Sequence, residues 1–145
     1  MTKRNLFLLG VLILAQLVYA GNWDDTKAQA KQENKLILLK FSGSDWCGPC
    51  IQLQKVIFDD PVFEQFAHEK LVLFKADFPR LKKNQLPKEQ QAINDQLAET
   101  YNPEGEFPCM ILIDAQGNTL RKWHGYDKKH TVQDYMADVN AFINK

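Results

Sequence analysis

The alternation of apolar and polar stretches along the chain predicts four strands. Residues 36–41 form a short, almost continuous apolar run, which is typical of a central strand covered on both faces. Further strands are predicted over 71–77 and 109–114. A turn signal at 116–118 follows, so residues 119–124 are expected to pair back as the second arm of a hairpin.

Helices are predicted where apolar residues recur at helical spacing between these strands. A polar segment with alanines, 23–34, is typical of a surface helix. Asp60 and Pro61 suit the N-cap and the first position of a later helix, and Thr131 with Asp134 resembles a capping box. The expected buried stripes are Leu53, Val56 and Ile57; Val62, Phe63, Phe66 and Ala67; Ile93, Leu97 and Tyr101 after Pro87; and Val132, Tyr135, Met136, Val139 and Ile143.

The predicted elements run in the order helix, strand, helix, strand, helix, strand, strand, helix. This order predicts an α/β fold with a central mixed sheet, parallel early and antiparallel at its last hairpin, flanked by helices on both faces. The chain has 145 residues, 45% of them hydrophobic, so one domain with a sizeable core is expected. The formal net charge is zero, and nothing points to nucleic acid or an anionic membrane surface as a partner.

The start of the chain has the pattern of a secretory signal peptide. A basic start and an apolar stretch over 6–18 precede Ala20, after which cleavage is expected. An uncleaved membrane anchor is the alternative, although the apolar stretch is shorter than the ~20 residues that usually span a bilayer. We expect residues 1–20 to be removed and residues 21–145 to form the domain, which is exported to an oxidising periplasm or secreted.

The segment Trp46-Cys47-Gly48-Pro49-Cys50 lies between a predicted strand and a predicted helix. The first thiol would sit at a helix N-terminus, where free N–H groups and the macrodipole favour the thiolate. The second thiol lies one turn on, within reach of a disulfide with the first. Gly48 permits a tight turn, and Pro49 suits a first helical turn. Two cysteines at this spacing also form half of a zinc site, but only one other cysteine exists, so no metal site is expected.

The string WCGPC is identical to the active-site string of thioredoxins, and the chain is identified as a member of the thioredoxin superfamily. The resemblance extends over about 23–143. It implies the thioredoxin fold and catalysis by Cys47 and Cys50, with Trp46, Gly48 and Pro49 as supporting residues.

A second part of the resemblance is the dipeptide Phe107-Pro108 before the strand at 109–114. In the family, a cis proline at this position faces the active-site disulfide. The resemblance therefore implies that Phe107 and Pro108 bind an extended substrate segment through backbone hydrogen bonds. The alternative is an ordinary trans proline at a strand start. Gly125 matches a family glycine that flanks the same groove.

Residues 42–47 and 57–61 resemble a narrower group within the superfamily. This group contains exported single-domain thioredoxin-like proteins and the C-terminal reducing domain of the membrane thiol transporter DsbD. The segment 78–101 is also longer than its counterpart in plain thioredoxins, which favours the exported group.

Two positions depart from the thioredoxin pattern, Lys40 and Cys109. The resemblance places Lys40 where thioredoxins carry a buried Asp that shuttles a proton for the second cysteine, unless the extra residue in the loop before the motif shifts the register. Lys75 matches the lysine usually found near that Asp, so the acid–lysine pair is incomplete, and Asp45 is a possible exposed substitute. Cys109 follows the proline where Thr is usual. It is either a small buried strand residue or a third thiol near Cys47.

The resemblance implies an exported thiol-disulfide oxidoreductase that needs no cofactor. Cys47 and Cys50 would cycle between dithiol and disulfide through a mixed disulfide with protein substrates. The Gly-Pro dipeptide resembles reducing members, which favours a disulfide reductase, and an exported reductase implies a membrane electron donor of the thiol-transporter type. A monomer is expected. The alternatives are a binding or chaperone module with a structural disulfide, a disulfide isomerase, or a metal- or copper-handling protein that uses Cys47, Cys50 and Cys109.

Overall fold

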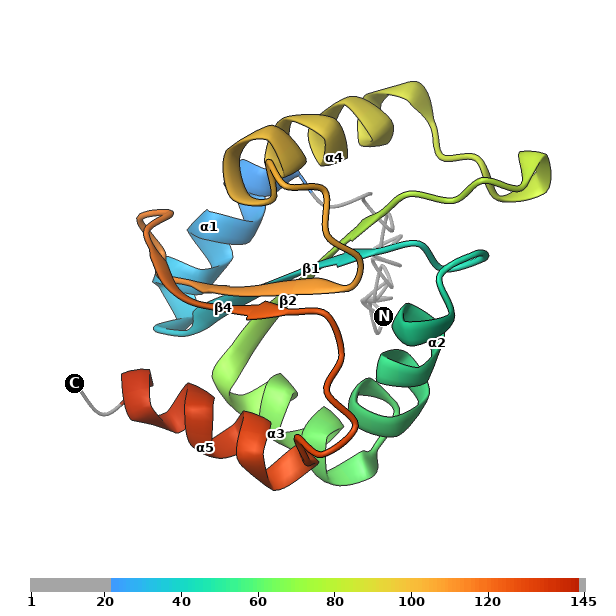
Figure 1. The fold of residues 1–145 in the computed structure, drawn as a ribbon. Coiled ribbons are helices and arrows are strands. Elements are labelled where there is room, and N and C mark those ends of the chain that lie inside the picture. The colour runs from blue at the N-terminus through green and yellow to red at the C-terminus, as the bar shows by residue number, and fades with distance from the viewer. Residues whose placement is uncertain (1–21, 144–145) are drawn as a thin grey trace, which may run out of the picture.

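A computed structural model describes residues 22–143, in which four strands form one mixed sheet (Figure 1). β1 pairs in parallel with β2, and β3 pairs antiparallel with both β1 and β4. The predicted sheet, parallel early and ending in an antiparallel hairpin, is confirmed. In the spatial order β2-β1-β3-β4, the strands are β1 Leu36–Ser42, β2 Leu71–Asp77, β3 Cys109–Ile113 and β4 Thr119–His124.

Helices cover both faces of the sheet, as the element order predicts. Two of them, α1 and α4, lie on one face, and α3 and α5 lie on the other (Figure 1). The short α2 follows β1 and runs on into a π-helical turn, Gln54–Phe58, on the side of α3. The bounds are α1 Trp23–Glu33, α2 Gly48–Leu53, α3 Pro61–Lys70, α4 Lys88–Tyr101 and α5 Val132–Ile143, and a 3₁₀ turn at Lys82–Asn84 interrupts the connection before α4.

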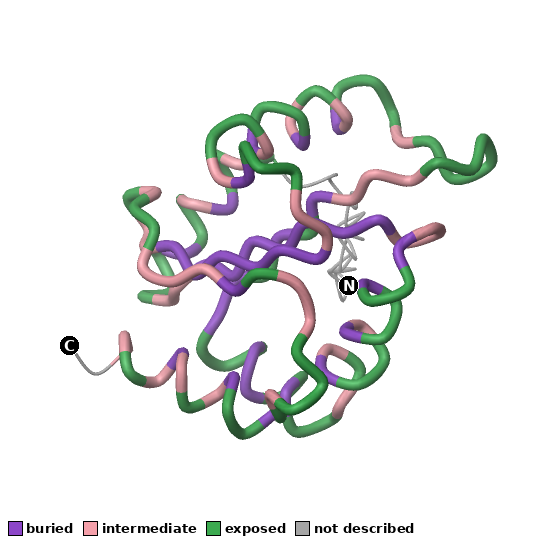
Figure 2. The backbone as a smooth tube through the Cα atoms, in the orientation of Figure 1, coloured by how far each residue is buried: buried purple, intermediate pink, exposed green. Residues whose placement is uncertain are grey.

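The central strands are buried (Figure 2). Their successive side chains enter two separate hydrophobic cores. Leu38 of β1 and Leu112 of β3 pack in the core beneath α3 and α5. Ile37 and Ile111 pack in the core beneath α1 and α4. Because alternate residues of a strand point to opposite faces, one apolar run supplies both cores. This double cover explains the continuous apolar pattern of β1.

The segment after Cys50 departs from the single helix predicted there. The α-helix ends at Leu53, and the following π-helical turn fits an extra residue into its turn, which rotates the side chains that follow. Val56 is consequently 51% exposed instead of lying in the predicted stripe, whereas Ile57 is buried as predicted. Val62 is also exposed, at 53%. The buried face of α3 consists of the other three residues of the predicted stripe, Phe63, Phe66 and Ala67.

One face of α4 is polar and buried, which the predicted apolar stripe did not anticipate. Asn94 is fully buried, and its side-chain N–H donates to the backbone oxygen of Asp77 at 2.9 Å. Gln90 in turn donates to the Asn94 side-chain oxygen at 2.9 Å. The Asn94 hydrogen bond connects α4 to the end of β2, next to the loop before the two cysteines, and Gln90 holds the Asn94 side chain in place.

The first helix, α1, begins at Trp23. Asn22 caps α1 by accepting the N–H of Asp24. None of the helices within residues 22–143 combines the length and hydrophobicity needed to traverse a bilayer. The predicted signal peptide, residues 1–20, lies outside the described residues.

Candidate active site

Cys47 and Cys50 lie where β1 leads into α2. The loop 43–46 turns the chain so that Cys47 becomes the N-cap of α2, with Pro49 in the first turn, as the spacing predicts. The Cys47 sulfur accepts the N–H of Cys50 at 3.3 Å, and the two sulfurs are joined in a disulfide. A hydrogen bond donated to sulfur stabilises a thiolate more than a thiol. Both cysteines are largely buried in this form, with 5% and 3% of their surfaces exposed.

Gly43 and Trp46 set the shape of the loop before the motif. The N–H groups of Trp46 and Cys47 both donate to the Gly43 oxygen, at 3.3 and 2.9 Å. A Cβ on Gly43 would lie 2.3 Å from the indole ring, so only glycine leaves room for Trp46 here. The indole N–H donates to the Phe78 oxygen at 2.7 Å. Sequence reasoning missed Gly43, whose only signal was a glycine between two serines shortly before the first cysteine.

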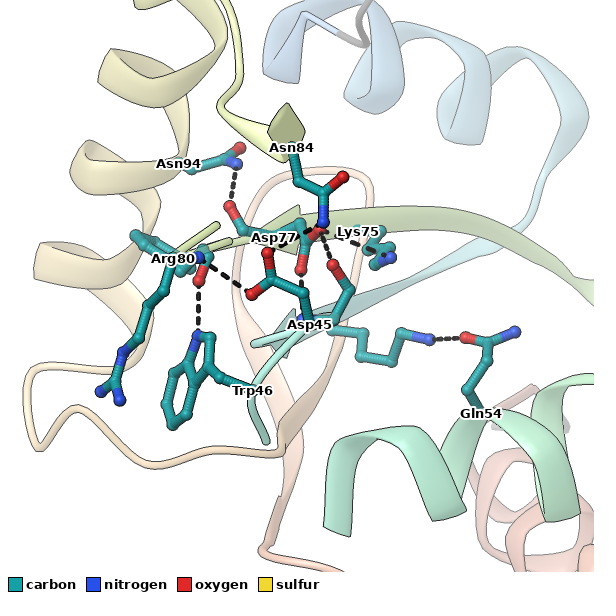
Figure 3. Close-up of polar contacts among 11 residues, drawn as sticks. Asp45, Trp46, Gln54, Lys75, Asp77, Arg80, Asn84 and Asn94 are labelled. Carbon is teal, nitrogen blue, oxygen red and sulfur yellow. Dashed lines mark hydrogen bonds and ion pairs between the residues drawn. The ribbon is translucent and has the colours of Figure 1, made fainter. Parts of the chain in front are cut away.

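Two carboxylates tie this loop to the chain that leaves β2 (Figure 3). Asp77 accepts hydrogen bonds from the backbone N–H of Ser44, at 3.0 Å, and from its hydroxyl. Asp45 accepts the backbone N–H groups of Arg80 and Leu81 at 2.9 and 3.0 Å. The bond from Arg80 is the main reason that the pKa of Asp45 lies below its ordinary value. The Asp45 carboxylate is therefore engaged by the chain that follows β2, and its role as a substitute acid stays a hypothesis.

Phe107 and Pro108 lie next to the motif and are joined by a cis peptide bond, as the family resemblance implies. The Phe107 ring packs edge-on against Trp46, with 5.5 Å between ring centroids. Gly125, at φ 68°, donates its N–H to the Pro108 oxygen at 2.9 Å. The Pro108 carbonyl is therefore occupied. Within the part of the chain that the structure describes, no hydrogen bond uses the backbone N–H or C=O of Phe107, which leaves that residue able to pair with an extended segment.

Lys40 brings an ammonium group into the core beside the motif. The residue is 6% exposed. Its Nζ donates to the Gln54 side-chain oxygen and lies 3.8 Å from the centroid of the Phe58 ring. Gln54 in turn donates to Asp59 at 2.7 Å. Burial, with a smaller contribution from the Lys75 charge, lowers the pKa of Lys40 to about 8. The hydrogen-bond partner of Lys40 is Gln54, the glutamine one turn after Cys50.

Lys75 does not rebuild the missing acid–lysine pair. It lies directly across from Lys40 in the parallel register of β1 and β2. Its side chain is 47% exposed and pairs with Asp77 at 3.7 Å. Lys75 and Gln54 line a hollow of about 270 Å³ that reaches Cys50. Asp59 and Lys55 line the same hollow, so charges of both signs lie around the approach to the second sulfur.

Cys109 lies in the core beneath α1 and α4, whereas Leu53 of α2 packs in the opposite core. Its thiol is fully buried and unpaired, and burial raises its pKa to about 11. These observations support a small buried strand residue over a third reactive thiol. Among residues 22–143, no three His, Cys, Asp or Glu side chains gather as metal ligands.

Comparison with known proteins places the chain among thioredoxin-like proteins. The thioredoxin-like domain family matches residues 23–140. Over 93 residues, 64% of this chain, the sequence is 41% identical to the disulfide bond reductase DsbH of Chlamydia pneumoniae. The matched part is 54% of that relative, so the chain spans about half of its length.

Solved structures agree with the fold. A structure described as DsbH oxidoreductase superposes with a TM-score of 0.74 at 30% identity, covering 99% of this chain and 95% of the other. The oxidised C-terminal domain of DsbD from Neisseria meningitidis gives a TM-score of 0.53 at 18% identity, over 81% of this chain and 89% of that domain. The second likeness shows the fold alone, and it agrees with the resemblance to the DsbD domain noted from the sequence. The chain therefore belongs to the thioredoxin-like domain family.

Proposed function

We propose that this chain is an exported thiol-disulfide oxidoreductase that reduces disulfides in client proteins through Cys47 and Cys50. The observation that carries the proposal is the Cys47–Cys50 disulfide, with the first sulfur capping α2 and accepting the Cys50 N–H. Phe107 packs against Trp46 beside this pair and has free backbone groups for a client segment. The similarity to a relative named disulfide bond reductase supports the reducing direction.

The reaction runs in two exchange steps. In the reduced protein, the Cys47 thiolate attacks one sulfur of a client disulfide, forms a mixed disulfide and releases the other client sulfur as a thiolate, which takes up a proton. Cys50 then loses its proton and attacks the Cys47 sulfur, which releases the second client thiol. The client gains two electrons and two protons, and Cys47–Cys50 becomes the disulfide. A membrane electron donor of the thiol-transporter type would reduce it again.

Insulin reduction with dithiothreitol tests the activity. Cys47→Ser should lower the rate to the background of dithiothreitol alone, and Cys50→Ser should accumulate mixed disulfides that identify clients. Cys109→Ser is the matched control and should keep the wild-type rate, because that thiol lies in the other core. A reduction potential near ~−120 mV, the value of a strong oxidant, would contradict the reductase direction.

A binding or chaperone module with a structural disulfide is the second candidate. The low exposure of both cysteine residues, at 5% and 3%, supports it. Equal insulin rates for wild type and Cys47→Ser would favour this candidate.

Export is tested separately from activity. The full chain with a C-terminal tag would be expressed in a bacterium that has a periplasm. N-terminal sequencing of the periplasmic product should start at Gly21, and an uncut chain in the membrane fraction would instead favour the anchor.

A further inference from the structure

A basic segment projects from the body of the molecule beside the redox motif (Figure 1). We name residues 78–84, which follow β2, the basic arm. The arm carries Arg80, Lys82 and Lys83 and no acidic residue. All three side chains are exposed, and none joins an ion pair with any described residue. The arm therefore presents three positively charged side chains to solvent, and the carboxylate that holds it, Asp45, bonds to the backbone and to Asn84 instead of to these charges.

The arm is held in place by the two residues that immediately precede Cys47. Asp45 accepts the backbone N–H groups of Arg80 and Leu81, and also the side-chain N–H of Asn84 at 2.9 Å (Figure 3). The Trp46 indole donates to the Phe78 oxygen at the base of the arm. A solvated loop needs no such anchoring. Here the hydrogen bonds fix the arm in position relative to the disulfide.

Arg80 is oriented by the same contacts. Its guanidinium lies 3.7 Å from the centroid of the Trp46 ring, a cation–π arrangement. The guanidinium N–H groups have no hydrogen-bond partner among residues 22–143. A planar guanidinium with free N–H edges binds a carboxylate through two parallel hydrogen bonds. The Arg80 guanidinium is thus already oriented, on the Trp46 ring next to Cys47, to bind a carboxylate through two hydrogen bonds.

We propose that the basic arm selects client disulfides that are flanked by acidic residues. This inference rests on the proposed reductase function and adds a substrate class to it. Arg80 binds one carboxylate beside the client disulfide, while Lys82 and Lys83 attract further acidic residues and raise the rate of encounter. Leu81, 48% exposed on the same arm, offers an apolar contact to the same client segment.

Two synthetic peptides test the selection. Both contain one intramolecular disulfide at the same cysteine spacing, and the flanking residues are Asp and Glu in one peptide and Ser and Gln in the other. The readout is the ratio of their second-order rate constants with the reduced protein. We expect the wild type to favour the acidic peptide by about tenfold in ~20 mM salt. The preference should shrink toward one in ~500 mM salt, where the charges are screened.

Variants locate the preference on the arm. Lys82→Gln with Lys83→Gln should lower the acidic-to-neutral ratio at least ~3-fold, and Arg80→Lys should lower it while keeping the charge, because the fork is lost. Lys31→Gln with Lys70→Gln removes the same charge beside Leu36, at the far end of β1, and should leave the ratio unchanged. Circular dichroism confirms that each variant is folded.

Two failures can be told apart. A wild-type ratio near one, or equal ratios in the arm variants and the control pair, would overturn the selection by the arm. Failure of the reduced wild type to react with either peptide, and with a small neutral disulfide, would overturn the reductase function instead.

Discussion

Lys40 is the residue at which burial and charge conflict most directly. Its ammonium lies in the core with a neutral glutamine and a phenyl ring for neighbours, next to the Lys75 charge. Burial favours the neutral amine, so the pKa falls from 10.5 to about 8. Between pH 8 and pH 10.5 the amine of Lys40 is more fully protonated in the unfolded chain than in the folded chain. The free energy of unfolding therefore rises with pH through this window, and below it the full penalty of the buried charge remains.

Lys40→Met should stabilise the oxidised protein at pH 7 by roughly 1–3 kcal/mol, because an apolar side chain avoids the buried charge. The gain should shrink as pH rises from 8 toward 10. Urea unfolding at several pH values measures it, as the difference from wild type. The exposed Lys75→Met is the control and should change stability by less than about 0.5 kcal/mol. A gain that is the same at every pH would contradict the assignment.

Cys109 should be unreactive in the folded protein, because its thiol is fully buried with a pKa of about 11. At pH 8, the oxidised protein should incorporate iodoacetamide at least ~100-fold more slowly in buffer than in guanidinium chloride. Mass spectrometry of the alkylated chain measures this. Fast labelling of the native protein would contradict this prediction and favour the hypothesis that Cys109 is a third reactive thiol.

At the scale of elements, the joint between β1 and α2 determines where the sulfurs lie. The β1 strand ends at Ser42, and the loop that follows is fixed by Gly43, Trp46 and the carboxylate of Asp77. On the far side, α4 is bonded to the Asp77 backbone through Asn94. The site is therefore supported by two elements that are distant from it in sequence.

Gly43→Ala should destabilise the protein by about 1–3 kcal/mol, because the new Cβ would overlap the Trp46 ring. It should also slow insulin reduction, since the displaced indole loses its bond to Phe78. Gly48→Ala is the matched control for stability: no atom lies within 4 Å of its Cβ, so stability should stay equal or rise slightly. Urea unfolding compares the two, and equal losses would refute the steric argument.

At the scale of the whole molecule, one sheet joins two hydrophobic cores. Trp123 is buried in the core beneath α3 and α5, and Trp23 packs against the core beneath α1 and α4. Because both cores share the strands β1 and β3, neither can be lost while the other stays intact. The domain should unfold as one cooperative unit.

Ile111→Ala and Leu112→Ala remove apolar volume from opposite cores, and each should lower the free energy of unfolding by about 2–5 kcal/mol. Tryptophan fluorescence and far-ultraviolet circular dichroism should give coincident urea transitions in both variants. Leu73→Ala, at a 50% exposed position of β2, is the control and should cost less than about 1 kcal/mol. Separate transitions for the two probes would contradict a single cooperative unit.

The sequence by itself determined the element order, the four strands and the position of the first cysteine at a helix start. These depend on local patterns: apolar runs, caps and the two-residue spacing of the cysteines. The helix after Cys50 was predicted less well, because a π-helical turn leaves no periodic signal and moved Val56 to the surface.

Only the tertiary structure decided which charged residues lie against the motif and which groups they contact. Asp45 and Asp77 each accept hydrogen bonds from a segment more than 30 residues away in the chain. Arg80 contacts the motif by lying over the Trp46 ring. The pairing of Lys40 with Gln54 likewise depends on how α2 lies over β1. Hydrogen bonds between segments distant in the chain follow from packing of the whole fold, and a local pattern cannot encode them.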